Sequence, residues 1–205
     1  MNRTWRKVSD SGFTLIELII AAALTIIVLV TVGSFLVSAG KAATSTRTAT
    51  AAATLGQLVA RSVTQGVANA TAVGVTTDST SGAQMLQARV FSLSSTNDPT
   101  QGNASGVGCE AWFYLPTNGG AVYVKQVFPA SAIAMPTGTP DSTWQLVGNG
   151  LGATVSEAES STVFAAPSGT RVDLKFDVVN GSQKPVHIET TIHIPNTTTV
   201  SSPCF

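Results

Sequence analysis

A single carboxylate interrupts a long apolar run near the N-terminus. The run extends from Phe13 to Val37, about 25 residues, and Glu17 is its one charged member. A charged side chain at the centre of a membrane helix costs about 2.5–3.5 kcal/mol on insertion scales, and less near a helix end. We therefore expect a cation beside Glu17. A lysine of another protein is one source, but a free amine created at Phe13 by cleavage of the chain would be closer and more regular.

The chain has two cysteines, Cys109 and Cys204, and both lie far beyond the apolar run. If that run crosses a membrane with its basic end inside, both thiols reach a compartment that permits disulfides. A bond between them would close a loop of roughly 95 residues and contribute about 4 to 5 kcal/mol in the chain-entropy description. Two unpaired thiols are the alternative. A metal site needs more ligands than these cysteines and two histidines obviously supply, so we predict the disulfide.

The sequence contains no recognisable catalytic motif. His187 and His193 are six residues apart on a predicted strand, hence on one face but roughly 20 Å from each other, too far to share a metal ion. We interpret both as solvated surface side chains. No glycine-rich phosphate loop, zinc signature or nucleophile elbow is visible. The sequence therefore predicts a protein that is not an enzyme and has no metal or cofactor.

The residues before the apolar run are basic. Arg3, Arg6 and Lys7 against Asp10 give the first twelve residues a net charge of +2, as expected for a segment kept in the cytoplasm. As a helix the run reaches about 37 Å, enough to cross a bilayer. A removable secretory signal has a shorter apolar region, and no small-residue cleavage site directly follows Val37. The pattern predicts a single-pass membrane segment whose N-terminus is cytoplasmic.

The seven residues Ser-Gly-Phe-Thr-Leu-Ile-Glu at positions 11–17 resemble the processing and methylation site of type IV prepilins and type II secretion pseudopilins. The resemblance implies that a membrane peptidase and methyltransferase cuts between Gly12 and Phe13 and methylates the new amino group of Phe13. It also implies that Glu17, fifth in the mature chain, pairs with the N-terminal amine of a neighbouring subunit during assembly. The further partners implied are other pilin subunits, an inner-membrane assembly platform and, before assembly, membrane lipid.

A second helical pattern follows the apolar run. Between Lys41 and Val73 the chain is rich in Ala and Thr, with an apolar stripe at i, i+4 spacing formed by Leu55, Val59, Val63 and Val67. Joined to the first segment, it predicts one helix of roughly 60 residues, about 90 Å long. The first half is apolar all round and the second half has one apolar face. Gly33 is a possible weak point in the first half.

The remainder of the chain changes to Ser, Thr, Gly, Val and Asn with alternating apolar positions, which predicts antiparallel strands. The expected strands are 85–93, 110–115, 121–128, 171–179 and 186–194, with turns at 116–120 and at Asn180-Gly181 and loops at 94–108 and 129–142. The predicted fold is α+β, the pilin arrangement of a long helix on an antiparallel sheet. The predicted segments are a leader (1–12), a transmembrane and assembly helix (13–40), its amphipathic continuation (41–73) and a globular head (74–205).

These observations favour a structural subunit of a type IV pilus or pilus-like filament, located in the cytoplasmic membrane before assembly and on the cell surface afterwards. The last predicted hairpin is loosely similar to the minor pilins and J-type pseudopilins of this family, which favours a minor subunit. The alternatives are a type II secretion pseudopilin, which would be periplasmic, and a singly anchored extracytoplasmic binding domain. Eleven basic residues balance eleven acidic ones, and no basic run with interleaved aromatics occurs in the head, so nucleic acid is not an expected partner.

Overall fold

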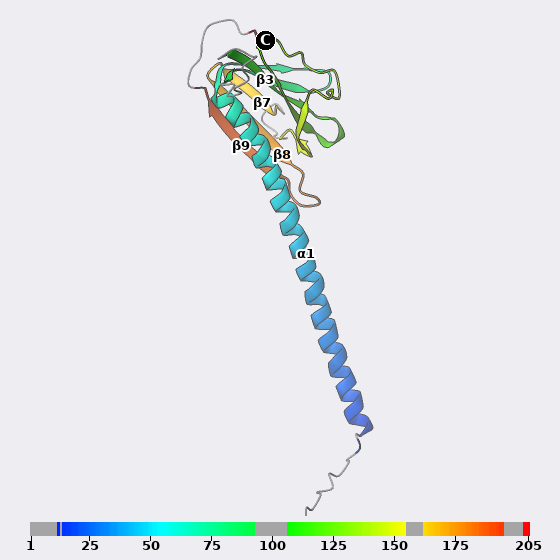
Figure 1. Cartoon of the computed structure of the whole chain (residues 1–205). Coiled ribbons are helices and arrows are strands. Elements are labelled where there is room, and N and C mark those ends of the chain that lie inside the picture. The colour runs from blue at the N-terminus through cyan, green and yellow to red at the C-terminus, as the bar shows by residue number, and fades with distance from the viewer. Residues whose placement is uncertain (1–11, 13, 93–105, 155–161, 195–202) are drawn as a thin grey trace, which may run out of the picture. The chain divides into compact units, whose positions relative to one another are not determined.

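The computed structural model (Figure 1) describes residue 12 and residues 14–92, 106–154, 162–194 and 203–205. The chain divides into two compact units, Met1–Arg47 and Thr48–Phe205. One helix, α1 (Leu15–Ala68), begins in the first unit and ends in the second. The described part of the first unit comprises Gly12, Thr14 and α1 up to Arg47, and the second unit contains the rest of α1 and both sheets.

The second unit contains two antiparallel sheets. The first has the order β1-β2-β3-β4-β5 and is formed by β1 (Ala70–Thr77), β2 (Gln84–Ser92), β3 (Gly106–Leu115), β4 (Ala121–Val127) and β5 (Gln145–Asn149). The second sheet is formed by β6 (Leu151–Gly152), β7 (Phe164–Ser168), β8 (Arg171–Val178) and β9 (Val186–His193). Strand β8 is central: it pairs with β9 along one edge and with β6 and β7 along the other.

One core joins α1 to both sheets. Of the apolar stripe predicted at i, i+4 spacing, Val59, Val63 and Val67 are buried in this core and Leu55 packs against it partly buried, which confirms the stripe. Ala52 extends the buried face towards the N-terminus. The first sheet contributes its helix-facing residues, including Trp112, and the second contributes the buried alternate residues of β8. Figure 1 shows β8 and β9 beside this part of α1. The α+β prediction of a long helix packed on an antiparallel sheet is confirmed.

A second apolar cluster covers the other face of the first sheet. It contains Met85, Ala111 and Phe113 from the sheet, Ile133 and Trp144 from the segment after β4, and Cys204. Because both of its faces are covered, β3 is buried continuously from Gly108 to Leu115 and shows no alternation of buried and exposed residues.

The five predicted strands all occur, as do the turns between them. A short 3-10 turn, η1 (Thr117–Gly119), connects β3 to β4, and the hairpin of β8 and β9 pairs Arg171 with His193 and Val178 with Val186. At Gly120 the backbone has φ +78° and a Cβ atom would collide with the carbonyl of Leu151, so this turn requires glycine. The predicted loop 129–142 contains no helix or strand.

The predicted helix boundary at Val73 is wrong. Helix α1 ends at Ala68, because Asn69 closes its last turn through bonds from its backbone N–H to the Gly66 carbonyl (3.3 Å) and from Nδ2 to the Gln65 carbonyl (3.1 Å). The following residues form β1 because they pair with β2 along its length. The predicted loop 94–108 also extends too far, since β3 already begins at Gly106, and residues 94–105 of it lie outside the described chain.

Candidate functional site

The first part of α1 is exposed over its whole circumference. Fifteen large apolar side chains between Leu15 and Val37 are 51–77% exposed. Helix α1 is long and apolar enough to cross a membrane, and no residue in its most apolar stretch is buried. Exposed apolar surface of this extent is unfavourable in water and must be covered by lipid or by other helices. This part of α1 is therefore a candidate membrane anchor.

The few hydroxyl groups in the anchor are satisfied by the helix itself. Thr25 Oγ1 donates to the Ala21 carbonyl (2.8 Å), Thr31 Oγ1 to the Ile27 carbonyl (3.1 Å) and Ser34 Oγ to the Thr31 carbonyl (2.9 Å). These donors need no partner from the surroundings, so their transfer out of water costs little. The helix is unbroken at Gly33, where an added Cβ would meet no atom within 4 Å.

Glu17 lies in the first turn of α1. Its backbone N–H donates to the Thr14 carbonyl at 3.1 Å, and the helix begins at Leu15. A carboxylate in this position interacts favourably with the unpaired N–H groups and positive dipole end of the helix. No cation within the described residues pairs with Glu17. The local helix therefore offsets part of the cost of the charge.

The two residues of the predicted cleavage site precede the helix. Gly12 is exposed and not helical, and a Cβ atom there would meet no atom within 4 Å. Phe13 lies outside the described residues. The predicted cleavage of the Gly12-Phe13 bond and the methylation of Phe13 stay predictions.

The predicted disulfide between Cys109 and Cys204 is confirmed. The two sulfur atoms are 2.00 Å apart and the Cα atoms 5.5 Å apart, and both residues are 1% exposed. Gln87 on the neighbouring strand β2 also binds this region. Its Nε2 donates to the carbonyl oxygens of Cys204 (3.0 Å) and Ile133 (2.8 Å). The bond attaches the C-terminal residues to the centre of the first sheet.

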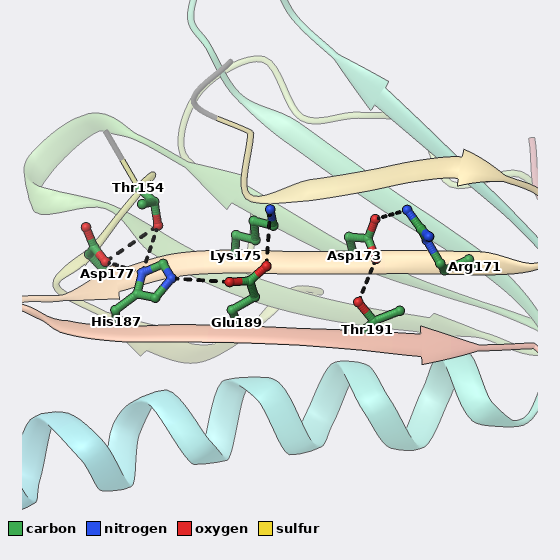
Figure 2. Close-up of polar contacts among 8 residues, drawn as sticks. All are labelled: Thr154, Arg171, Asp173, Lys175, Asp177, His187, Glu189 and Thr191. Carbon is green, nitrogen blue, oxygen red and sulfur yellow. Dashed lines mark hydrogen bonds and ion pairs between the residues drawn. The ribbon is translucent and has the colours of Figure 1, made fainter. Parts of the chain in front are cut away.

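Charged side chains form a row along β8 and β9, here called the ladder (Figure 2). Its members are Arg171, Asp173, Lys175 and Asp177 of β8 and His187 and Glu189 of β9. Arg171 pairs with Asp173 (2.9 Å) and Lys175 with Glu189 (3.2 Å), with side chains between 16% and 54% exposed. The alternation along β9 was visible in the sequence, but the cross-strand partners depend on the register with β8. Ion pairs of this exposure stabilise by about 0–1 kcal/mol each. These ion pairs supply partners for the charged side chains of the two strands.

His187 lies within this ladder. Its Nδ1 is 2.8 Å from Asp177 Oδ1 and 3.3 Å from Thr154 Oγ1, and its Nε2 is 3.7 Å from Glu189 Oε2. His193 lies at the far end of β9, opposite Arg171. The described residues contain no group of three or more His, Cys, Asp or Glu side chains arranged to hold a metal ion.

The sequence analysis did not single out the buried carboxyl group of Glu110. Glu110 on β3 is only 8% exposed, and its Oε1 accepts a hydrogen bond from Gln126 Nε2 at 3.0 Å. Burial raises the pKa of this carboxyl group, and the bond from Gln126 opposes the increase. The sequence shows only a single Glu in a predicted strand. Its burial could not be predicted without knowing that α1 covers this face of the sheet.

Comparisons with protein-family models, with curated proteins and with solved structures gave no match.

Proposed function

We propose that this chain is a structural subunit, and a minor one, of a type IV pilus or pilus-like filament. The observation that carries the proposal is the exposed apolar part of α1 with one carboxylate, Glu17, in its first turn. The same surface suits two environments, because a helix that is apolar on every side is equally stable in lipid and among copies of itself. Assembly then moves the helix from lipid into a bundle without new chemistry.

In this proposal a peptidase removes residues 1–12 and the new amine of Phe13 is methylated. The amine of one subunit pairs with Glu17 of its neighbour inside the helix bundle. Opposite charges attract strongly in a medium of low dielectric, whereas a misplaced subunit leaves both charges buried and unpaired. The main effect of the pair is therefore to select one axial register of the subunits. Its net contribution to the stability of the filament is small. The head has no catalytic part in this function and no cofactor.

The first experiment is the N-terminal mass of the protein from native membranes, with and without the prepilin peptidase. The expected result is a chain that begins at methylated Phe13 only when the peptidase is present. A chain that begins at Met1 in both cases would contradict the proposal and favour an ordinary membrane-anchored domain.

A second experiment tests the role of Glu17 in assembly. Glu17→Val is expected to be processed and to remain in the membrane but to be lost from sheared filaments. Glu189→Val is the matched control, because it removes a carboxylate that is 54% exposed on the head. Normal incorporation of Glu17→Val would exclude the register role of this residue.

A further inference from the structure

A wide cleft in the second unit lies between the last turns of α1 and the adjoining ends of β3 and β4. Its volume is about 1280 Å³. Sites for drug-sized ligands hold about 300–1,000 Å³ and are lined mostly by apolar side chains. This cleft is larger, and more than half of the residues that line it have polar side chains. It therefore suits an extended polar ligand rather than a compact apolar one.

Helix α1 contributes a row of polar side chains to the lining. Arg61, Gln65 and Asn69 are spaced four residues apart, so they follow one another along one face of the helix and its end. All three are exposed. Within the described part of the chain, the side chains of Arg61 and Gln65 form no hydrogen bond or ion pair. These groups are therefore available to a ligand in the cleft.

The first sheet contributes a carboxylate with an unused oxygen. Glu110 on β3 and Gln126 on β4 lie directly opposite each other, and both line the cleft. Gln126 Nε2 donates to Glu110 Oε1 at 3.0 Å. The other oxygen, Glu110 Oε2, accepts no hydrogen bond from the described residues, although Glu110 is only 8% exposed. A buried acceptor without a donor costs free energy, so this oxygen favours a ligand that donates a hydrogen bond.

The charges of the lining do not select a charged ligand. Arg61 and Lys125 are basic and Glu110 is acidic. The Lys125 ammonium lies 5.7 Å from the ring centroid of Trp144, which belongs to the cluster on the opposite face of the sheet. The remaining lining is rich in primary amides, namely Gln65, Asn69, Gln126 and Gln145. A primary amide both donates and accepts hydrogen bonds, as a hydroxyl group does. An uncharged ligand with several hydroxyl groups fits this lining better than a cation or an anion.

An aromatic ring is also part of the lining. Phe128, directly after β4, is 40% exposed, and an added Cβ at Gly108 would be 3.6 Å from its ring. The face of an aromatic ring is negative, so it attracts the polarised C–H groups that lie along one side of a sugar ring. The cleft thus combines hydrogen-bonding groups for hydroxyls with a flat apolar surface for a sugar ring.

We propose that this cleft binds an uncharged oligosaccharide. Hydroxyl groups of the sugar donate to Glu110 Oε2 and to the side-chain carbonyl of Gln126, and the ring of Phe128 stacks against the C–H face of one sugar unit. The volume leaves room for more than one unit. This binding activity goes beyond the filament role. It concerns the head alone and holds whether or not the chain assembles.

The test applies the full-length chain, in a polyoxyethylene detergent without a sugar head group, to an array of neutral and acidic oligosaccharides. We expect binding to neutral oligosaccharides of two or more units. Titration calorimetry with the strongest of them gives the Kd. Binding to no oligosaccharide would overturn the inference. Binding to acidic oligosaccharides alone would also overturn it, and would indicate an anion site instead.

A carboxylate variant locates the hydrogen bonds. Glu110→Gln keeps the shape of the side chain but replaces one acceptor oxygen with a donor, and should weaken binding about tenfold or more. Its matched control is Glu189→Gln, which changes a carboxylate that is 54% exposed in the ladder. The control should stay within about twofold of the wild type.

An aromatic variant tests the stacking and does not depend on a buried residue. Phe128→Leu keeps an apolar side chain but removes the flat ring, and should weaken binding about threefold to tenfold. Phe205→Leu is the matched control, because Phe205 is 51% exposed and is not part of the lining. Unchanged affinity in both Glu110→Gln and Phe128→Leu would mean that the sugar binds elsewhere, which overturns the inference.

Discussion

At Gly66 the helix has no side chain, and this allows two large groups of β3 to approach it. A Cβ atom there would clash with the Trp112 indole and lie 2.6 Å from Glu110 Oε2. The indole is held in place because its Nε1 donates to Ser62 Oγ at 3.0 Å, one helical turn before Gly66. The close approach of α1 to β3 therefore depends on Gly66.

Gly66→Ala should destabilise the head despite the higher helix propensity of alanine. Overpacking costs about 1–3 kcal/mol and the higher helix propensity returns about 1 kcal/mol, so we expect a net loss of up to about 2 kcal/mol. Urea unfolding of the full-length chain in detergent, followed by Trp fluorescence, measures it. Gly40→Ala is the matched control, since a Cβ at Gly40 meets no atom within 4 Å and should not lower stability. Equal effects of the two substitutions would contradict the steric explanation.

Glu110→Gln should stabilise the head at neutral pH. Burial raises the pKa of Glu110 in the folded state, so the ionised carboxylate destabilises the fold. The stability that the wild type has with this group protonated is therefore lost as pH rises through the folded-state pKa. Below the ordinary glutamate pKa both proteins carry a neutral group and their stabilities should converge. Thermal unfolding at a series of pH values tests this. A variant that is less stable than wild type at neutral pH would show that the charge is compensated within the fold.

At the scale of elements, α1 combines two kinds of surface. Its first part exposes apolar side chains in every direction, while its second part buries one stripe, with Val59, Val63 and Val67 fully inaccessible. Gly56 lies opposite Ile188 of β9, where an added Cβ would be 2.7 Å from the Ile188 side chain. The second part thus packs against both sheets.

Val59→Ala should therefore destabilise the head by about 2 kcal/mol, through lost burial and a residual cavity. Leu58→Ala, one residue earlier, removes a larger side chain that is 54% exposed and should change stability by less than about 0.5 kcal/mol. Chemical unfolding of both variants makes the comparison. A greater loss for Leu58→Ala would mean that the helix packs through a different face.

At the scale of the whole molecule, the disulfide connects positions 95 residues apart, from the centre of the first sheet to the C-terminal residues. Phe205, which follows Cys204, packs over Gly74 of β1, where an added Cβ would be 3.3 Å from the Phe205 ring. The C-terminus is therefore held against the first sheet by a covalent bond and by an aromatic contact.

Reduction of the disulfide should lower the stability of the head by about 4 to 5 kcal/mol in the chain-entropy description. The double variant Cys109→Ala, Cys204→Ala should unfold at the same denaturant concentration with or without reductant. Unfolding curves of the wild type with and without reductant give the difference. An unchanged midpoint after complete reduction would mean that apolar packing alone holds the C-terminus.

The sequence by itself determined the apolar first part of α1, the apolar stripe of its second part, the strands β2, β3, β4, β8 and β9, and the disulfide, because hydrophobic periodicity, the position of charges and the number of cysteines are local or compositional signals. Tertiary structure decided the rest. β1, β5, β6 and β7 are short or contain Gly or Pro, and they become strands only by pairing with neighbours. The burial of Glu110 and the ladder partners of His187 likewise follow from register and from the position of α1, since contacts between distant residues leave no local pattern.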